Sequence, residues 1–235
     1  MSRTRIIALG DSLTKGVVLR NDNRYAVTDS NYMDIISSEL DMSVENYGKF
    51  GCTVGFGNNM IDRHYAEIAD SDYTFLEYGG NDCDFDWMKI AQAPDLDHSP
   101  KTRLESFGEQ FLKLIERVRS LGSVPVIVSL PPIISEMYFS FFSRMMTDEQ
   151  KTNVVKWLGG YVGIISRWHE SYNRSLFKIA SMTGTQIYDI TTPFDIYRGD
   201  IRSLYCPDGI HPNAEGHKLI ARTIIAHCIR RVRKD

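Results

Sequence analysis

The sequence has no long apolar run. No stretch of its 235 residues approaches the ~20 consecutive apolar residues of a membrane-spanning helix, so we expect no membrane span. The start of the chain leads from Met1 into the short apolar run Ile6–Leu9, which is far too short for the hydrophobic region of a secretory signal peptide. We therefore expect a cytoplasmic protein, although a signal removed or replaced upstream would leave no trace in this sequence.

Cysteine is scarce, and no CxxC pair occurs. In a chain of this kind isolated cysteines are free thiols more often than a disulfide framework or a zinc site. They are Cys52, Cys83, Cys206 and Cys228. The alternating Asp82, Asp84 and Asp86 do not make a calcium loop, because Trp87 and Ala93 stand where such a loop needs glycine and glutamate. We expect neither a metal nor an organic cofactor.

The sequence also lacks a strong excess of charge. A net charge of −3 at pH 7 provides no general attraction to nucleic acid or to an anionic membrane, and we expect neither as a partner. Basic residues gather only near the C-terminus, where they are typical of a solvated helix end whose cations favour the helix dipole. They are Arg230, Arg231, Arg233 and Lys234.

Short apolar runs alternate with longer amphipathic segments, which is typical of β-α units around a mainly parallel sheet. The expected strands are Arg5–Leu9, Ser43–Tyr47, Tyr73–Tyr78, Val124–Leu130 and Gln186–Ile190. The expected helices are Asn31–Leu40, Leu104–Leu121, Tyr161–Met182 and Ala214–Arg231. Since no linker or repeat divides the chain and its 43% hydrophobic content can build one core, we expect a single α/β domain over residues 1–235.

Two segments, Cys83–Pro100 and Ile133–Gly160, fit no β-α unit. The first is rich in acidic residues and the second in aromatic residues and methionine. Long insertions at strand ends of α/β folds often cover the binding crevice, so we expect both to flank the site. The aromatic side chains of the second segment are equally consistent with a satellite core under a loop and with an apolar wall for a substrate.

Two motifs far apart in the sequence carry the chemistry. Gly10–Gly16, with the sequence GDSLTKG, follows the first expected strand, where an open α/β sheet binds its ligands. Ser12 becomes a good nucleophile only if a base takes its proton, and histidine, which stands at position 211, is the residue type suited to this role. Asp208, three residues before His211, could orient the ring and stabilise the imidazolium. Each motif alone is also an ordinary turn or helix cap.

Two glycine-containing turns supply candidate donors for an oxyanion. Asn46–Thr53 follows the second expected strand, and Gly79–Asp82 follows the third. A glycine amide and an asparagine side chain can donate to the negative charge that develops during acyl transfer. All four clusters follow strands or lie in the last strand-to-helix loop, so we expect them to converge at one edge of the sheet.

Together the four clusters resemble the SGNH, or GDSL, hydrolase family over nearly the whole chain. The order fits a GDSxxxG block at Gly10–Gly16, a glycine after the second strand, GxND at Gly79–Asp82 and DxxH at Asp208–His211. The resemblance implies a flavodoxin-like, three-layer α/β/α sandwich with about five parallel strands. It further implies that Ser12 is the nucleophile, His211 the base and Asp208 the third member of a catalytic triad.

The same resemblance implies an oxyanion hole made of the amides of Ser12 and Gly51 and the side chain of Asn81. Gly48 and Gly55 lie close by, but Gly51 is preferred because it precedes Cys52 and Thr53, as the family glycine usually precedes a small polar pair.

The resemblance implies a serine esterase that hydrolyses a small-molecule carboxylic ester through an acyl-enzyme. A carbohydrate O-acetyl esterase and a lysophospholipase- or thioesterase-type acyl hydrolase stand nearly level as alternatives. A non-catalytic ligand-binding module on the same fold is disfavoured, because it would have no need to retain Ser12, Asn81, Asp208 and His211 together. We expect Cys83 and Cys206 to be small buried residues instead of nucleophiles, and His217 to be a surface residue of the last helix.

Overall fold

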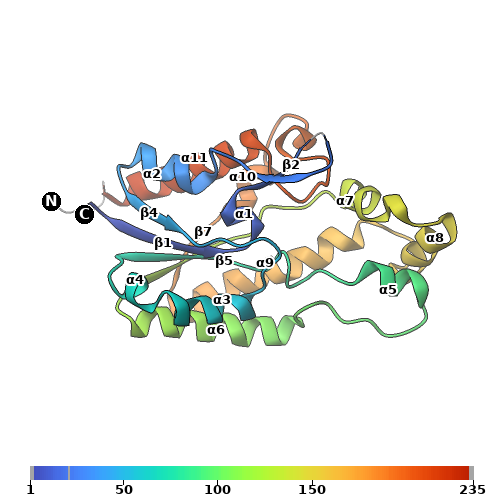
Figure 1. The fold of residues 1–235 in the computed structure, drawn as a ribbon, viewed down its shortest axis with the longest axis horizontal. Helices are drawn as coiled ribbons and strands as arrows, with labels where there is room; N and C mark the ends of the chain where they lie inside the picture. Colours follow the sequence, from blue (N-terminus) through green and yellow to red (C-terminus); the bar gives the residue numbers. More distant parts are fainter. Residues whose placement is uncertain (1–2, 21, 233–235) are drawn as a thin grey trace.

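A five-stranded parallel sheet forms the centre of the protein (Figure 1). The computed structural model describes residues 3–20 and 22–232, with side chains of the last helix as far as Cys228; the side chains of the C-terminal basic cluster therefore lie outside the described part. The strands are β1 (Arg5–Gly10), β4 (Ser43–Asn46), β5 (Tyr73–Glu77), β6 (Val124–Val128) and β7 (Gln186–Tyr188). Their order is β4-β1-β5-β6-β7, and every pairing is parallel. The predicted fold class is confirmed.

Strand β1 lies between β4 and β5 and is buried on both faces, which is why it reads as one continuous apolar run. Because side chains alternate across a strand, Ile7 and Leu9 enter one core and Ile6 and Ala8 the other. Helices α3 (Val54–Arg63), α6 (Leu104–Ser120) and α9 (Ile164–Thr183) cover the first face. Helices α2 (Tyr32–Glu39) and α11 (Ala214–Val232) cover the second. Figure 1 shows the three layers edge-on.

The four predicted helices are present as α2, α6, α9 and α11. Helix α9 ends at Gly184, whose φ of +63° is the left-handed conformation of a glycine cap. The shorter helices α1 (Ser12–Lys15), α4 (Tyr65–Ala69) and α10 (Thr191–Asp195) were not expected. Neither was α3, because Gly55 and Gly57 weaken its helical pattern. A tertiary contact stabilises the start of α3 despite these glycines, because the carboxylate of Asp82 accepts hydrogen bonds from the N–H of Val54 in the first turn.

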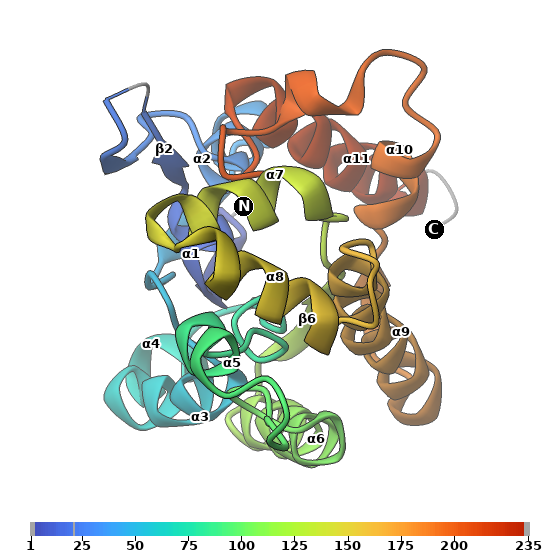
Figure 2. The same cartoon turned by 90° about the vertical axis from the view of Figure 1, so that its right-hand side faces the viewer.

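The two segments that fitted no β-α unit contain three helices, which were not predicted. They are α5 (Trp87–Gln92), α7 (Ser135–Phe142) and α8 (Asp148–Trp157), and the 3-10 turn Ser143–Met145 joins α7 to α8. The helices pack on each other through a third apolar cluster that includes Trp87, Ile90 and Val154. All three stand beyond the ends of the strands in Figures 1 and 2. We call them the cap helices.

A two-stranded antiparallel hairpin, β2 (Val17–Leu19) and β3 (Tyr25–Val27), follows α1. Strands of three residues are too short for alternation to reveal them, and sequence analysis missed both. In the part of the chain that the structure describes, no helix is both long and apolar enough to cross a bilayer. The cytoplasmic location stays a prediction.

Candidate active site

Ser12 is the first residue of α1, directly after β1 reaches the carboxyl edge of the sheet. The turn is tight, because a Cβ added to Gly10 would lie 2.2 Å from the Thr14 hydroxyl oxygen. Asp11 caps the helix by accepting from the N–H of Leu13 at 2.9 Å. The hydroxyl of Ser12 therefore sits on a short, rigid turn at the edge where open α/β sheets bind ligands.

The loop from Asp208 to His211 meets this turn from the opposite end of the chain. His211 Nε2 lies 2.9 Å from Ser12 Oγ, and His211 Nδ1 lies 2.7 Å from Asp208 Oδ2. The other carboxylate oxygen of Asp208 accepts from the backbone N–H groups of His211 and Ile210. Three of the residues predicted from sequence thus form one chain of hydrogen bonds.

The protonation state of this chain follows from its surroundings. Burial alone would raise the pKa of Asp208, which is fully buried, but the hydrogen bonds and charge of His211 outweigh it and hold the pKa below its usual value. An ionised Asp208 only accepts, so Nδ1 of His211 carries the hydrogen and Nε2 is left to accept from the Ser12 hydroxyl. This is the tautomer in which a histidine can take a proton from serine.

The cap helices help to fix the Asp208–His211 loop. The N–H of Ile134, just before α7, donates to the carbonyl oxygen of Gly209 at 2.9 Å. The packing is close, since a Cβ on Gly209 would lie 2.5 Å from that of Met137. The hydroxyl of Tyr205 donates to the carbonyl oxygen of Pro132. The segment after β6 therefore supports the loop that carries His211.

Among the three candidate glycines for an oxyanion hole, the structure favours Gly51. It lines the same cavity as Ser12, and within the described residues its N–H has no hydrogen-bond partner. The N–H of Gly48 instead donates to Asn46 Oδ1 at 2.9 Å. Gly55 lies inside α3 and away from the cavity.

Asn81 also lines this cavity, and one hydrogen of its side-chain amide is held by Asp11 Oδ2 at 2.9 Å. An amide has two such hydrogens, so a second remains for a ligand. Asp82 connects the turn that carries Asn81 with the turn that carries Gly51. It directly follows Asn81, and its carboxylate accepts from the N–H of Val54, which lies three residues after Gly51. Burial raises the pKa of Asp82 to about 6.

A buried polar network lies beneath Ser12. Glu77, at the end of β5, accepts from the Thr14 hydroxyl at 2.9 Å, and Thr14 also meets the hydroxyl of Tyr32 at 2.9 Å. Burial and the neighbouring charge of Asp11 raise the pKa of Glu77 well above its usual value. Burial also raises the pKa of Asp11, and a like charge beside a buried carboxyl favours its protonated form; we therefore expect a proton on Glu77. Sequence analysis missed Glu77, whose signal is an acidic residue within an otherwise apolar strand.

Aromatic side chains surround His211, and sequence analysis missed these too. The ring of Tyr25, from β3, lies 5.3 Å from the imidazole, and the ring of Phe50 lies 6.1 Å away in a stacked orientation. Burial and the charge of Asp208 raise the pKa of Tyr25. The unexpected hairpin therefore forms one side of the site.

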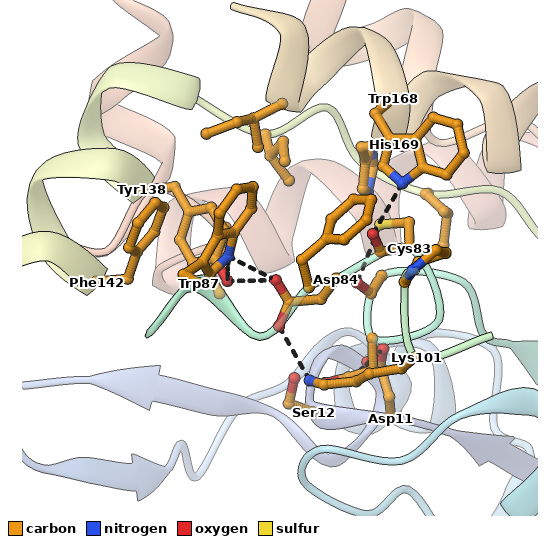
Figure 3. Close-up of a pocket in the computed structure, with 18 of the residues that line it drawn as sticks. Asp11, Ser12, Cys83, Asp84, Trp87, Lys101, Tyr138, Phe142, Trp168 and His169 are labelled. Carbon is orange, nitrogen blue, oxygen red and sulfur yellow. Dashed lines mark hydrogen bonds and ion pairs between the residues drawn. The ribbon is translucent and has the colours of Figure 1, made fainter. Parts of the chain in front are cut away.

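One cavity of about 580 Å³ opens from Ser12 into the space beneath the cap helices (Figure 3). Its lining includes Ser12, Gly51, Asn81 and His211. The remainder, which we call the aromatic chamber, is walled mainly by Phe85, Trp87, Tyr138, Phe142, Trp157 and Trp168. In Figure 3, Trp87, Tyr138 and Phe142 stand together as one wall. Both unassigned segments thus contribute to the cavity beside Ser12.

Two expectations about single residues differ in outcome. Cys83 and Cys206 are small buried residues with free thiols, as predicted. The prediction that His217 is a surface residue is wrong: it is completely buried and stacks on Tyr32. Within residues 3–20 and 22–232, no three histidine, cysteine or acidic side chains gather as they would around a metal ion.

The three-layer sandwich and the hydrogen-bonded serine, histidine and aspartate at its carboxyl edge define the class of SGNH hydrolase folds. The profile of the GDSL-like lipase/acylhydrolase family matches residues 8–219, and the chain belongs to this family.

Similar proteins align with nearly the whole chain. The uncharacterized protein YpmR of Bacillus subtilis (strain 168) is 25% identical over 226 residues, which cover 93% of this chain and 79% of that protein. A lipase/acylhydrolase from Enterococcus faecalis has the same fold, with a TM-score of 0.62 at 17% identity and coverage of 97% and 96% of the two chains. An acetylxylan esterase from Geobacillus stearothermophilus, in a catalytic mutant, aligns with a TM-score of 0.59 at 18% identity, covering 96% and 94%.

Proposed function

We propose that the protein is a serine esterase that cleaves a carboxylic ester through an acyl-enzyme. The observation that carries this proposal is the continuous chain from Ser12 Oγ to His211 Nε2 at 2.9 Å and from His211 Nδ1 to Asp208 at 2.7 Å. A serine hydroxyl has little nucleophilicity without a base in hydrogen-bond reach, and this geometry supplies one.

The proposed reaction runs in two halves. Ser12 Oγ attacks the ester carbonyl carbon while His211 Nε2 accepts the hydroxyl proton, and Asp208 stabilises the imidazolium. The carbonyl oxygen becomes negative and accepts from the amides of Ser12 and Gly51 and the side chain of Asn81. His211 then gives its proton to the leaving alcohol, which departs as the acyl-enzyme forms. A water molecule, deprotonated by His211, attacks the acyl carbon; the bond to Ser12 Oγ then breaks, His211 returns the proton to Oγ, and the acid is released. The sequence of steps requires no metal or organic cofactor.

The supporting residues fit this scheme. Ser12 begins a helix, so its N–H has no partner within that helix. The Asp11 carboxylate fixes the side-chain amide of Asn81, and a donor held in place before reaction stabilises the transition state most effectively. We further propose that residues 1–235 act as one catalytic domain, because β1 and the Asp208–His211 loop build the site jointly.

The test is the variant Ser12→Ala assayed with p-nitrophenyl acetate. We expect unchanged folding and a fall in turnover of at least about 10⁴-fold, because the attacking oxygen is lost. Ser38→Ala, an exposed serine on α2, is the matched control and should retain full activity. Turnover by Ser12→Ala at the wild-type rate would refute the mechanism.

A fluorophosphonate probe separates this proposal from the non-catalytic alternative. An activated serine reacts with such a probe, whereas a serine in a binding module does not. We expect labelling of Ser12 in the wild type and none in Ser12→Ala. Labelling at Cys83 instead would assign the nucleophile to a thiol.

A further inference from the structure

The cavity beside Ser12 is far larger than an acetyl group. About 580 Å³ lies within the range of roughly 300–1,000 Å³ that is usual for pockets binding drug-sized ligands. A single methyl group would leave most of this space empty. The aromatic chamber is also strongly apolar, with six aromatic side chains and several aliphatic ones on its walls.

The polar groups of the chamber walls are turned toward one another. Asp84 accepts from Trp87 Nε1 at 2.9 Å, from the Tyr138 hydroxyl at 2.8 Å and from Lys101 Nζ at 2.9 Å. The indole N–H of Trp168 donates to the carbonyl oxygen of Cys83 at 2.9 Å. These side chains therefore present mostly carbon to the cavity, although they carry polar atoms.

His169 is the exception among the buried side chains of the chamber. It projects from α9, is only 4% exposed and lines the cavity. Within the described residues its ring nitrogens have no hydrogen-bond partner, yet, unlike those of His217, they are not sealed off from open space. Burial lowers the pKa of His169 to about 4. At neutral pH the ring is thus uncharged, with one donor and one acceptor nitrogen.

The position of His169 relative to Ser12 determines which part of a bound substrate can contact the imidazole. Figure 3 shows the two residues on opposite sides of the cavity. An acyl group bound to Ser12 would have to cross the cavity to reach the imidazole. A buried polar group that is left unpaired by a ligand costs binding free energy, so a purely hydrocarbon chain would be a poor match for that end.

We propose, on the basis of the esterase activity proposed above, that the substrate's acyl group is a bulky apolar chain or ring with one neutral hydrogen-bonding group. That group, a hydroxyl or a carbonyl oxygen, pairs with His169 at the far end of the cavity. A charged group does not fit, since a neutral imidazole offers no counter-charge and burying an unpaired ion is costly. An acetyl group alone would leave the chamber unfilled, which disfavours an acetyl ester whose alcohol lies outside it.

The first test compares p-nitrophenyl acetate with p-nitrophenyl octanoate. Each methylene buried in an apolar site should raise kcat/KM by roughly threefold to fourfold. Allowing for incomplete burial, we expect the octanoate to be preferred by about 100-fold. Equal or better turnover of the acetate would overturn the inference of a bulky acyl group.

The second test examines His169 with octanoates hydroxylated at carbon 6, 7 or 8. In the wild type we expect the best of them to exceed octanoate in kcat/KM by roughly twofold to tenfold, the value of one net hydrogen bond. In His169→Leu the order should reverse, because a buried hydroxyl would then lack a partner. His169→Gln keeps a neutral donor and acceptor and should restore a preference for the hydroxylated ester. His227→Leu, the same substitution outside the cavity, should leave the preference unchanged.

The outcomes separate this inference from the proposed function. Loss of p-nitrophenyl acetate turnover in every histidine variant would report misfolding, so fluorophosphonate labelling of Ser12 checks each variant. If the wild type is labelled and hydrolyses all esters without any preference for a hydroxyl, the role of His169 is refuted and only water binds there, while the esterase proposal stands. If Ser12 is neither labelled nor required for turnover, both proposals fail.

Discussion

The burial of His217 predicts a specific loss of stability in acid. This side chain is fully buried on α11, and neither ring nitrogen has a partner among the described residues. Burial, assisted by the charge of His211, lowers the pKa of His217 from 6.5 to about 4. Below pH 6.5 the unfolded chain therefore binds a proton that the folded chain does not, and the folded state loses stability until the pH reaches about 4.

The size of this loss follows from the two pKa values. The gap between 6.5 and about 4 corresponds to about 3 kcal/mol, at roughly 1.4 kcal/mol for each pKa unit. Leucine is close to histidine in volume and does not titrate. His217→Leu loses the stacking on Tyr32 but also removes two unpaired nitrogens, so at pH 7 we expect a change within about 1 kcal/mol. At pH 4 the variant should be more stable than the wild type by about 3 kcal/mol.

Urea unfolding at pH 7, 5.5 and 4, followed by circular dichroism, measures the difference between the two proteins. Other titrating groups contribute equally to both and cancel. Ile220→Val is the control, since Ile220 is buried on the same helix and has no charge to gain; it should cost about 1 kcal/mol at every pH. If the free energies of unfolding of wild type and His217→Leu change in parallel from pH 7 to pH 4, His217 is not neutral and buried, and the argument is refuted.

Substitutions at two further positions, Asp208 and Glu77, test the polar groups around Ser12. In Asp208→Asn, the amide oxygen can keep the backbone N–H groups of Ile210 and His211, so its NH₂ faces Nδ1 and imposes the wrong tautomer; kcat for p-nitrophenyl acetate should fall by about 10⁴-fold, and a loss below tenfold would contradict the assigned role. Because the raised pKa of Glu77 favours its protonated form, Glu77→Gln should retain folding and activity. The raised pKa of Glu77 makes the wild type lose stability as pH rises above 4.5, and this decline between pH 5 and pH 8 in urea unfolding should be smaller in Glu77→Gln, whereas Glu77→Ala should destabilise by about 3 kcal/mol. An equal decline in wild type and Glu77→Gln would show that Glu77 is ionised.

Sequence patterns located the most buried strands because β1 and β6 are short, almost continuous apolar runs. Strand β1 is buried on both faces, so its residues form an uninterrupted hydrophobic stretch. Such runs do not give the order of the strands, because that order depends on pairing between distant segments. Ser12, Asp208 and His211 were found through motifs, because each lies in a turn whose residue types are restricted.

Long-range packing was not visible in the sequence. Tyr25 comes beside His211 only because the hairpin folds over the site. The segments that contain the cap helices were expected beside the site, but the helices themselves were not predicted. His217 is a different case. It is spaced three, four and seven residues before Ile220, Ala221 and Ile224, all buried, so the helical periodicity that placed these residues in the core would have placed His217 there too.

The hydrogen bond between Ser12 and His211 joins residues 199 positions apart. During synthesis at roughly 5–20 residues per second, the serine would leave the ribosome about 10–40 s before its partner histidine. Until then Ser12 would be an ordinary alcohol on a partly formed sheet. A nascent or truncated chain would therefore be chemically inert towards the esters and acylated metabolites around it, and reactivity would begin only once the two ends of the sandwich had come together.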